Sequence, residues 1–78
     1  MSFRTEEEVK YGCKKVLHLH DDTRVNSHVG TVWQDRSSEK WSAFCTASPK
    51  LWGPLGSKFT SQEEATKSIE EKVKLEVV

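Results

Sequence analysis

The sequence predicts an α+β domain in which a three- to four-stranded, mainly antiparallel sheet carries one C-terminal helix on one face. Two observations predict this fold. Segments rich in Val, Thr and Trp alternate with polar turns between residues 13 and 59, as in a run of consecutive strands. After them, Ala65, Ile69 and Val73 recur at the spacing of one helix face. Strands that cluster ahead of a helix are typical of α+β architecture.

The length predicts a single domain over residues 1–78. A chain of 78 residues buries only about 60–65% of its extended surface, and no repeat or linker divides this one. Twelve Lys and Arg balance twelve Asp and Glu. No apolar run approaches the roughly 20 residues that cross a bilayer, and the first residues lack the pattern of a secretory signal. With only two Cys, these features favour a cytoplasmic protein.

The first residues favour a short helix. Thr5 precedes Glu8 by three positions, the spacing of a capping box. Gly12 is a suitable C-terminal stop for such a helix. We therefore expect a short N-terminal helix ahead of the first strand.

Four segments have strand composition and alternation. They are residues 13–20, 29–34, 40–46 and 55–59. The second and third flank a short polar turn, so we expect them to form a β-hairpin. Residues 47–54 hold both prolines and a glycine and predict an irregular loop.

The segment after residue 59 predicts a helix. Either Thr60 or Ser61 can cap it, because Glu63 and Glu64 follow at capping-box spacing. The tail over residues 73–77 alternates apolar and polar side chains, so it is either a final strand or a frayed helix end.

The hairpin pattern does not fix which face of the sheet meets the helix. One face would carry Val29, Thr31, Trp33, Trp41, Ala43 and Cys45. The other would carry Gly30, Val32, Gln34, Ser42, Phe44 and Thr46. We favour the first as the core, since its small residues let a helix approach closely. The second, half-polar face would then be free for a partner.

The central half of the chain resembles a DNA-binding fold. It reads Gly30-Thr31-Val32, Lys40-Trp41-Ser42-Ala43, Leu55-Gly56-Ser57-Lys58-Phe59-Thr60 and Glu63-Glu64-Ala65. This order is similar to the AP2 domain of plant transcription factors and to the arm-binding domain of phage-type integrases. The resemblance implies a three-stranded sheet on one helix, with the free sheet face entering the major groove of double-stranded DNA.

A DNA-binding role would draw on a small set of polar residues. The expected contacts to phosphate are Arg36, Lys40, Lys50 and Lys58, and those to base edges are Gln34 and Ser42. Residues 28–60 hold four basic and two acidic side chains, whereas AP2-type sheets carry several Arg along the DNA face. The first functional hypothesis is a small non-enzymatic DNA-binding or accessory module of phage type.

A second hypothesis is a protein-interaction module. Trp52 lies in a loop bounded by Pro and Gly, and exposed Trp often anchors an interface. Together with Leu51 and Phe44 it would dock the chain on a larger host or phage enzyme. Alternatively, Leu51 and Trp52 fold back and plug one end of the sheet. A C-terminal edge strand would also offer a route to a homodimer.

No catalytic or metal-binding pattern stands out. His18 and His20 are two positions apart on a predicted strand and share a face, and we interpret them as exposed. They, His28 and the two Cys lack the paired spacing of structural zinc ligands. We interpret Cys13 and Cys45 as small buried side chains. No nucleophile has a local signature, so we expect neither an enzyme nor a bound cofactor.

Overall fold

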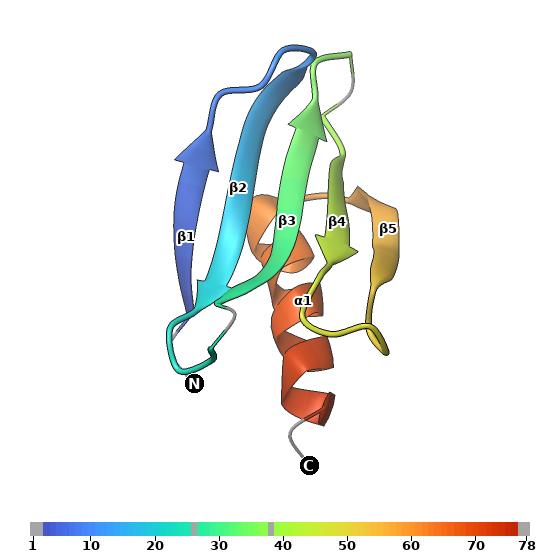
Figure 1. Ribbon diagram of the computed structural model, residues 1–78. Helices are drawn as coiled ribbons and strands as arrows, with labels where there is room; N and C mark the ends of the chain where they lie inside the picture. Colours follow the sequence, from blue (N-terminus) through green and yellow to red (C-terminus); the bar gives the residue numbers. More distant parts are fainter. Residues whose placement is uncertain (1–2, 26, 38, 77–78) are drawn as a thin grey trace.

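The computed structural model describes residues 3–25, 27–37 and 39–76, and its chain forms five strands followed by one helix (Figure 1). These elements are β1 Phe3–Glu8, β2 Cys13–Asp21, β3 His28–Asp35, β4 Trp41–Cys45, β5 Gly53–Phe59 and α1 Gln62–Glu76. The strands lie side by side in this order and all pairings are antiparallel. The α+β prediction is confirmed, with five strands in place of three or four.

The first residues form an edge strand, so the predicted N-terminal helix is wrong. Phe3 pairs with Asp21 and Glu8 with Val16 along the whole length of β1. A helix this short is marginal in water, whereas an extended chain gains a ladder of hydrogen bonds from β2. Gly12 serves the turn into β2 with a φ of 92°, a conformation that favours glycine.

The C-terminal end is helical to Glu76, so of the two alternatives for the tail the final strand is wrong over residues 73–76. Residue 77 lies outside the described residues. Val73 stays in register with Ala65 and Ile69, and all three are fully buried. These side chains form one continuous apolar stripe, and its burial stabilises a helix more than the alternation of the tail favours a strand. Within the described part of the tail there is no edge strand through which two copies could pair.

The start of α1 shows which of the two candidate N-caps, Thr60 or Ser61, is used. The Ser61 Oγ accepts a hydrogen bond from the Glu64 backbone N at 3.2 Å, which makes Ser61 the N-cap. The Glu64 carboxylate in turn accepts from the Thr60 Oγ1 at 2.7 Å and from the Thr60 N at 3.3 Å. These bonds lower the pKa of Glu64.

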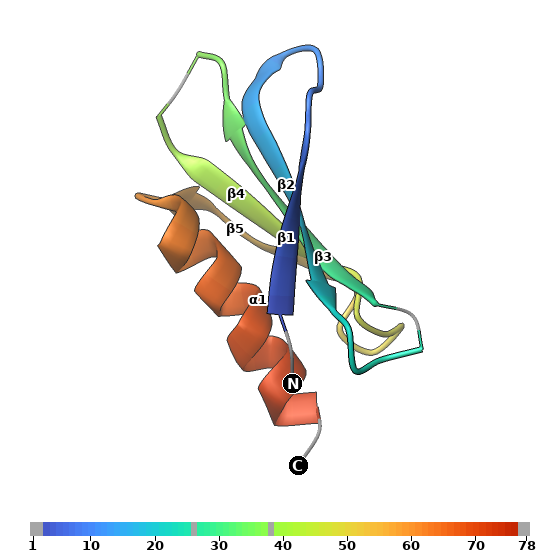
Figure 2. The same ribbon diagram turned by 90° about the vertical axis from the view of Figure 1, so that its left-hand side faces the viewer.

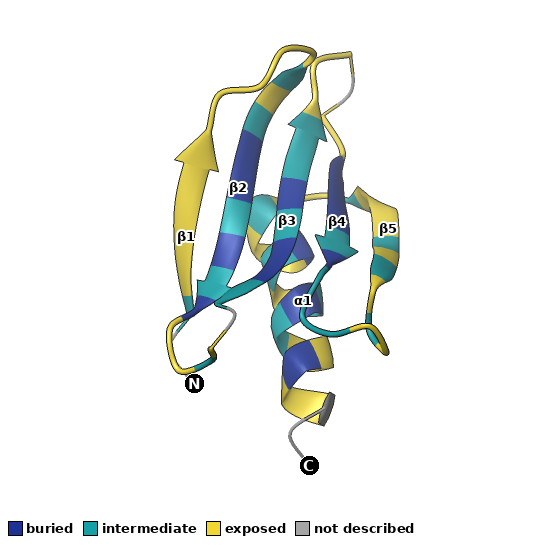
Figure 3. Ribbon diagram, in the orientation of Figure 1, coloured by how far each residue is buried: buried dark blue, intermediate teal, exposed yellow. Residues whose placement is uncertain are grey.

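The helix covers one face of the sheet and leaves the other uncovered by any helix (Figures 1 and 2). Its buried stripe packs on the residues of the central strands, and Figure 3 shows burial concentrated there, with β1 and much of β5 exposed. The buried core residues of the sheet are Leu17, Leu19, Val29, Val32, Trp41, Ala43 and Cys45. Among the described helices, none is long and apolar enough to cross a membrane.

The strand register corrects the expected division of the hairpin into faces. Gly30 pairs with Cys45 and Val32 with Ala43, so these residues share the helix face. Thr31 and Trp33 lie on the opposite face, and their expected place in the core is wrong. The expectation for Trp41, Ala43, Cys45 and Val29 is confirmed. The error arises because alternation in the sequence divides each strand into two faces but does not say which face of β3 lies on the same side of the sheet as which face of β4. Only the pairing of the strands decides this.

Candidate functional site

The sheet face opposite α1, here called the open face, presents two different surfaces. Towards β1 lies the histidine cluster, formed by His18, His20 and His28 with the polar side chains that contact them. Towards β5 lies the aromatic patch, formed by Trp33, Phe44 and Trp52. Apart from Trp52, which lies in the β4–β5 loop, the side chains that define both surfaces come from strand residues whose neighbours turn to the core.

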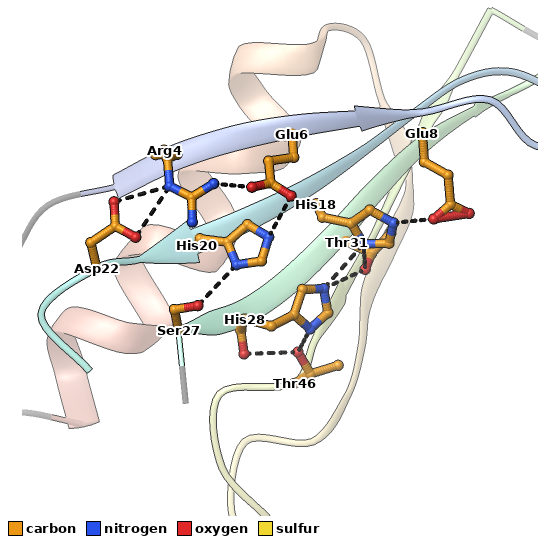
Figure 4. Close-up of polar contacts among 10 residues, drawn as sticks. All are labelled: Arg4, Glu6, Glu8, His18, His20, Asp22, Ser27, His28, Thr31 and Thr46. Carbon is orange, nitrogen blue, oxygen red and sulfur yellow. Dashed lines mark hydrogen bonds and ion pairs between the residues drawn. The ribbon is translucent and has the colours of Figure 1, made fainter. Parts of the chain in front are cut away.

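Three polar atoms converge at the centre of the histidine cluster (Figure 4). The His18 Nδ1 lies 3.1 Å from the His28 Nε2 and 3.1 Å from the Thr31 Oγ1. The Thr31 Oγ1 lies 3.2 Å from the His28 Nε2. The two rings come from neighbouring strands, β2 and β3, with centroids 5.2 Å apart.

The outer nitrogen of each central ring has its own partner. The His18 Nε2 lies 2.8 Å from the Glu8 Oε2, and the His28 Nδ1 lies 2.9 Å from the Thr46 Oγ1. His20 stands to one side, with its Nδ1 3.2 Å from the Ser27 Oγ. These contacts fix the orientation of all three rings.

The cluster is only partly exposed to solvent. The side chains of His18 and His20 are 26% and 15% exposed, so the expectation of exposed histidines is wrong. Burial lowers the pKa of His28, and the charges of His18 and His20 lower it further. His28 is therefore neutral near pH 7. The hydrogen bond from His18 lowers the pKa of Glu8, which keeps that carboxylate charged.

The aromatic patch combines an exposed indole with a pocket. The Trp52 ring stands edge-on to the Phe44 ring, with centroids 5.7 Å apart, and Trp52 is 63% exposed. A pocket of about 360 Å³ opens beside Phe44 on the same face. Its lining includes Val16, Thr31 and Trp33, and it reaches the β1–β2 turn at Tyr11. The patch thus joins an apolar hollow to a projecting aromatic ring.

The expected docking residues separate into two environments. Phe44 and Trp52 are brought together on the open face. Leu51 instead packs against the core, as in the alternative where the loop plugs the sheet. Sequence reasoning misses Trp33 as a surface residue because it assigns this side chain to the wrong face of the sheet.

The four candidate phosphate contacts lie at different edges of the domain. Arg36 is in the β3–β4 turn, with its guanidinium 5.8 Å from the Tyr11 ring centre. Lys50 is in the β4–β5 loop. The charge of Lys40 helps to lower the pKa of Glu64, and Lys58 lines a groove with that same carboxylate. The structure does not gather these cations on the open face.

The two candidate base contacts also lie apart. Gln34 pairs with Trp41 on the helix face, and its Nε2 donates to the Glu39 carbonyl at 3.0 Å. Ser42 is on the open face but only 7% exposed.

Comparison with protein-family models, curated proteins and solved structures finds no match to this chain. The resemblance to AP2 and arm-binding domains therefore stays a prediction. The sheet has two strands, β1 and β2, beyond the three that the resemblance implies.

Proposed function

We propose that this chain is a small binding module that docks on a protein partner through the aromatic patch of its open face. The observation that carries the proposal is Trp52, which is 63% exposed and held edge-on against Phe44. A 78-residue domain has few large apolar side chains for its core. An exposed aromatic pair beside an apolar pocket is the kind of surface that anchors interfaces.

The chemistry of the open face favours one kind of partner segment. A pocket of about 360 Å³ is near the lower end of ligand pockets and suits a large apolar side chain. Glu8 pairs in register with Val16, which lines the pocket, and its pKa is lowered. A segment with an aromatic or aliphatic anchor would therefore find an apolar contact in the pocket, and a Lys or Arg on its β1 side would meet Glu8. The Tyr11 end of the pocket instead carries Lys10 and Arg36.

DNA binding receives less support from this face. Glu6 and Glu8 present carboxylates on its β1 side, which repel phosphate. Of the candidate cations, Arg36 lies against Tyr11 at the rim of the pocket on this face, whereas Lys58 lines a groove at another edge. The DNA-binding hypothesis is tested separately, by titration with duplex DNA at low salt.

A peptide selection tests the proposal. Random peptides displayed on phage are selected against the chain, and the affinities of the enriched sequences are measured by calorimetry. We expect apolar anchors with a basic residue on one side, with binding weakened at least tenfold by Trp52→Ala, an effect typical of an interface anchor. Leu75→Ala is the matched control, because Leu75 is 71% exposed but lies on α1.

Two outcomes would contradict protein docking. One is a set of selected peptides that bind the Trp52→Ala and Leu75→Ala chains equally well. The other is binding of duplex DNA at low salt that disappears when Arg36 and Lys40 are neutralised, which would support the DNA-binding hypothesis instead.

A further inference from the structure

The centre of the histidine cluster has the spacing of a metal-binding site. The His18 Nδ1, His28 Nε2 and Thr31 Oγ1 form a triangle with edges of 3.1, 3.1 and 3.2 Å. Donor atoms about 2.1 Å from one ion lie roughly 3.0 Å apart in octahedral and roughly 3.4 Å apart in tetrahedral geometry. The observed edges fall between these values, so one ion just above the triangle would reach all three atoms.

The outer contacts of the two rings match those of metal-bound histidines. Ligand histidines usually hold their second nitrogen on a carboxylate or another fixed oxygen, which sets the tautomer. Here the His18 Nε2 contacts the Glu8 carboxylate and the His28 Nδ1 contacts the Thr46 hydroxyl. When the His18 Nε2 and the His28 Nδ1 each carry a proton, the His18 Nδ1 and the His28 Nε2 carry none and can bind a metal ion.

The same residues satisfy both the metal-free and the metal-bound state. Without metal, the Thr46 hydroxyl donates to the His28 Nδ1, the His28 Nε2–H donates to the His18 Nδ1, and the His18 Nε2–H donates to Glu8. With metal, the His28 proton moves to Nδ1 and donates to the Thr46 Oγ1. The Thr46 hydroxyl then turns to the His28 carbonyl, 3.4 Å away. In both states the two imidazole rings and the Thr46 hydroxyl have partners for their polar atoms.

We propose that His18 and His28 bind a divalent transition-metal ion through the Nδ1 of the first and the Nε2 of the second, with the Thr31 hydroxyl as a third, weak donor. Two imidazoles suit ions of the zinc, nickel and copper group better than magnesium or calcium. Among the described residues no three His, Cys, Asp or Glu side chains gather closely enough to enclose an ion. The remaining coordination positions of the ion would then be filled by water.

Burial supports this role in one further respect. Only a neutral imidazole binds a metal ion. Because burial and the neighbouring rings lower the pKa of His28, this ring is in its binding form at neutral pH. Protons and metal then compete for the same nitrogens, so the affinity falls on acidification.

Titration of the full chain with Zn²⁺ under reducing conditions at pH 7.5 tests the site. Calorimetry should give one ion per chain. His18→Gln and His28→Gln should each weaken binding at least tenfold, and Glu8→Gln should weaken it about 10- to 100-fold as the loss of a supporting carboxylate. His20→Gln is the matched control, because His20 belongs to the same face but lies outside the triangle. Trp52→Ala should leave Zn²⁺ binding unchanged, which separates this site from the docking surface.

Two measurements on the unaltered chain keep the proposal testable if a variant fails to fold. Imidazole ¹⁵N shifts should move for the His18 Nδ1 and the His28 Nε2 on adding Zn²⁺, and Co²⁺ should show nitrogen and oxygen ligation without thiolate. The proposal is overturned by no binding at millimolar Zn²⁺, by an equal loss in His20→Gln, or by a thiolate signature from Cys13 or Cys45.

Discussion

Gly30 is a residue of β3 at which α1 comes too close to leave room for a side chain. A Cβ at this position would lie 2.6 Å from the Ile69 Cδ1 and 2.9 Å from the Phe44 carbonyl oxygen. Overpacking of this kind costs about 1–3 kcal/mol. We expect Gly30→Ala to lower the free energy of unfolding in urea by about that amount, while Ser57→Ala on exposed β5 changes it little.

A double substitution tests the physical cause. Ile69→Val removes the Cδ1 that a new Cβ would meet first. The cost of Gly30→Ala should therefore be smaller in a chain that already carries Ile69→Val than in the unaltered chain. Strict additivity of the two costs would mean that contact with the Ile69 Cδ1 is not what excludes a side chain here, since Val keeps the Cγ2 that lies 2.9 Å from the new Cβ.

Asp21 is a buried carboxylate that organises the turn after β2. It is 1% exposed, and its Oδ1 accepts from the Thr23 N at 3.1 Å and from the Thr23 Oγ1 at 2.6 Å. Removing the acceptor breaks two hydrogen bonds, worth about 0.5–1.5 kcal/mol each and about 1–3 kcal/mol together. Asp21→Ala should destabilise by this amount in urea unfolding. Asp22→Ala, which breaks only the exposed ion pair with Arg4, should cost less than about 1 kcal/mol; equal losses would show that the burial of Asp21 is unimportant.

At the scale of elements, α1 depends on its first turn. Ser61 caps the Glu64 amide, and Glu63 and Glu64 complement the positive end of the helix dipole. Loss of an N-cap side chain costs about 1 kcal/mol. Ser61→Ala should show this loss in thermal or urea unfolding, and Ser61→Asp should restore most of it. No difference between the Ala and Asp variants would argue against a capping role.

The strand β1 is the least buried element of the sheet. Five of its six residues are exposed and it pairs with β2 alone. A segment with few buried contacts opens locally at a lower free energy than the core. Native-state hydrogen exchange should therefore give lower opening free energies for the β1 amides than for those of β3. Protection of β1 equal to that of β3 would show that the sheet opens only as one unit.

The elements that the sequence predicts well are those whose local pattern agrees with their packing. The stripe of Ala65, Ile69 and Val73 is helical both locally and in the fold. Residues 3–8 are not such a case, because their capping-box spacing favours a helix while β2 offers hydrogen bonds to a strand. Local patterns carry no information about a neighbour that arrives from elsewhere in the chain.

The candidate site shows the same difference between local and long-range information. The alternation of side chains along a strand is enough to place His18 and His20 on one face from the sequence alone. The arrival of His28 depends on a register shift, in which Leu19 pairs with Gly30 but His20 pairs with His28. A β-bulge of this kind redirects side chains and leaves no clear pattern in the sequence. The triangle with Thr31 was therefore beyond sequence reasoning.

At the scale of the whole molecule, the two layers divide the apolar residues unequally. The helix face takes most of the aliphatic side chains, while Trp33, Phe44 and Trp52 remain on the open face. Because the core is complete without them, substitution of Trp52 should affect binding far more than stability. The histidine cluster differs in this respect, because protonation of its rings changes the free energy of unfolding.

Acidification should destabilise the domain in two steps. The pKa of His28 in the folded state lies below its ordinary 6.5, chiefly because of burial. The unfolded chain therefore binds this proton more readily than the folded chain, and the unfolding free energy falls as the pH drops from about 7 through the folded pKa. The pKa values of Glu6 and Glu8 are lowered from 4.5 by Arg4 and His18 respectively, so a second loss follows below pH 4.5.

Urea unfolding followed from pH 8 to pH 3 separates the two steps. In His28→Gln the first loss should disappear, because the titrating ring is gone, while the carboxylate step should remain. In His20→Gln the first loss should persist but become smaller, because His28 remains while one of the charges that lower its pKa is gone. A constant or rising stability between pH 7 and pH 5 would mean that the folded chain takes up the proton as readily as the unfolded chain. His28 would then not be held neutral by its surroundings, and protons would compete with a metal ion for its Nε2 already at a higher pH.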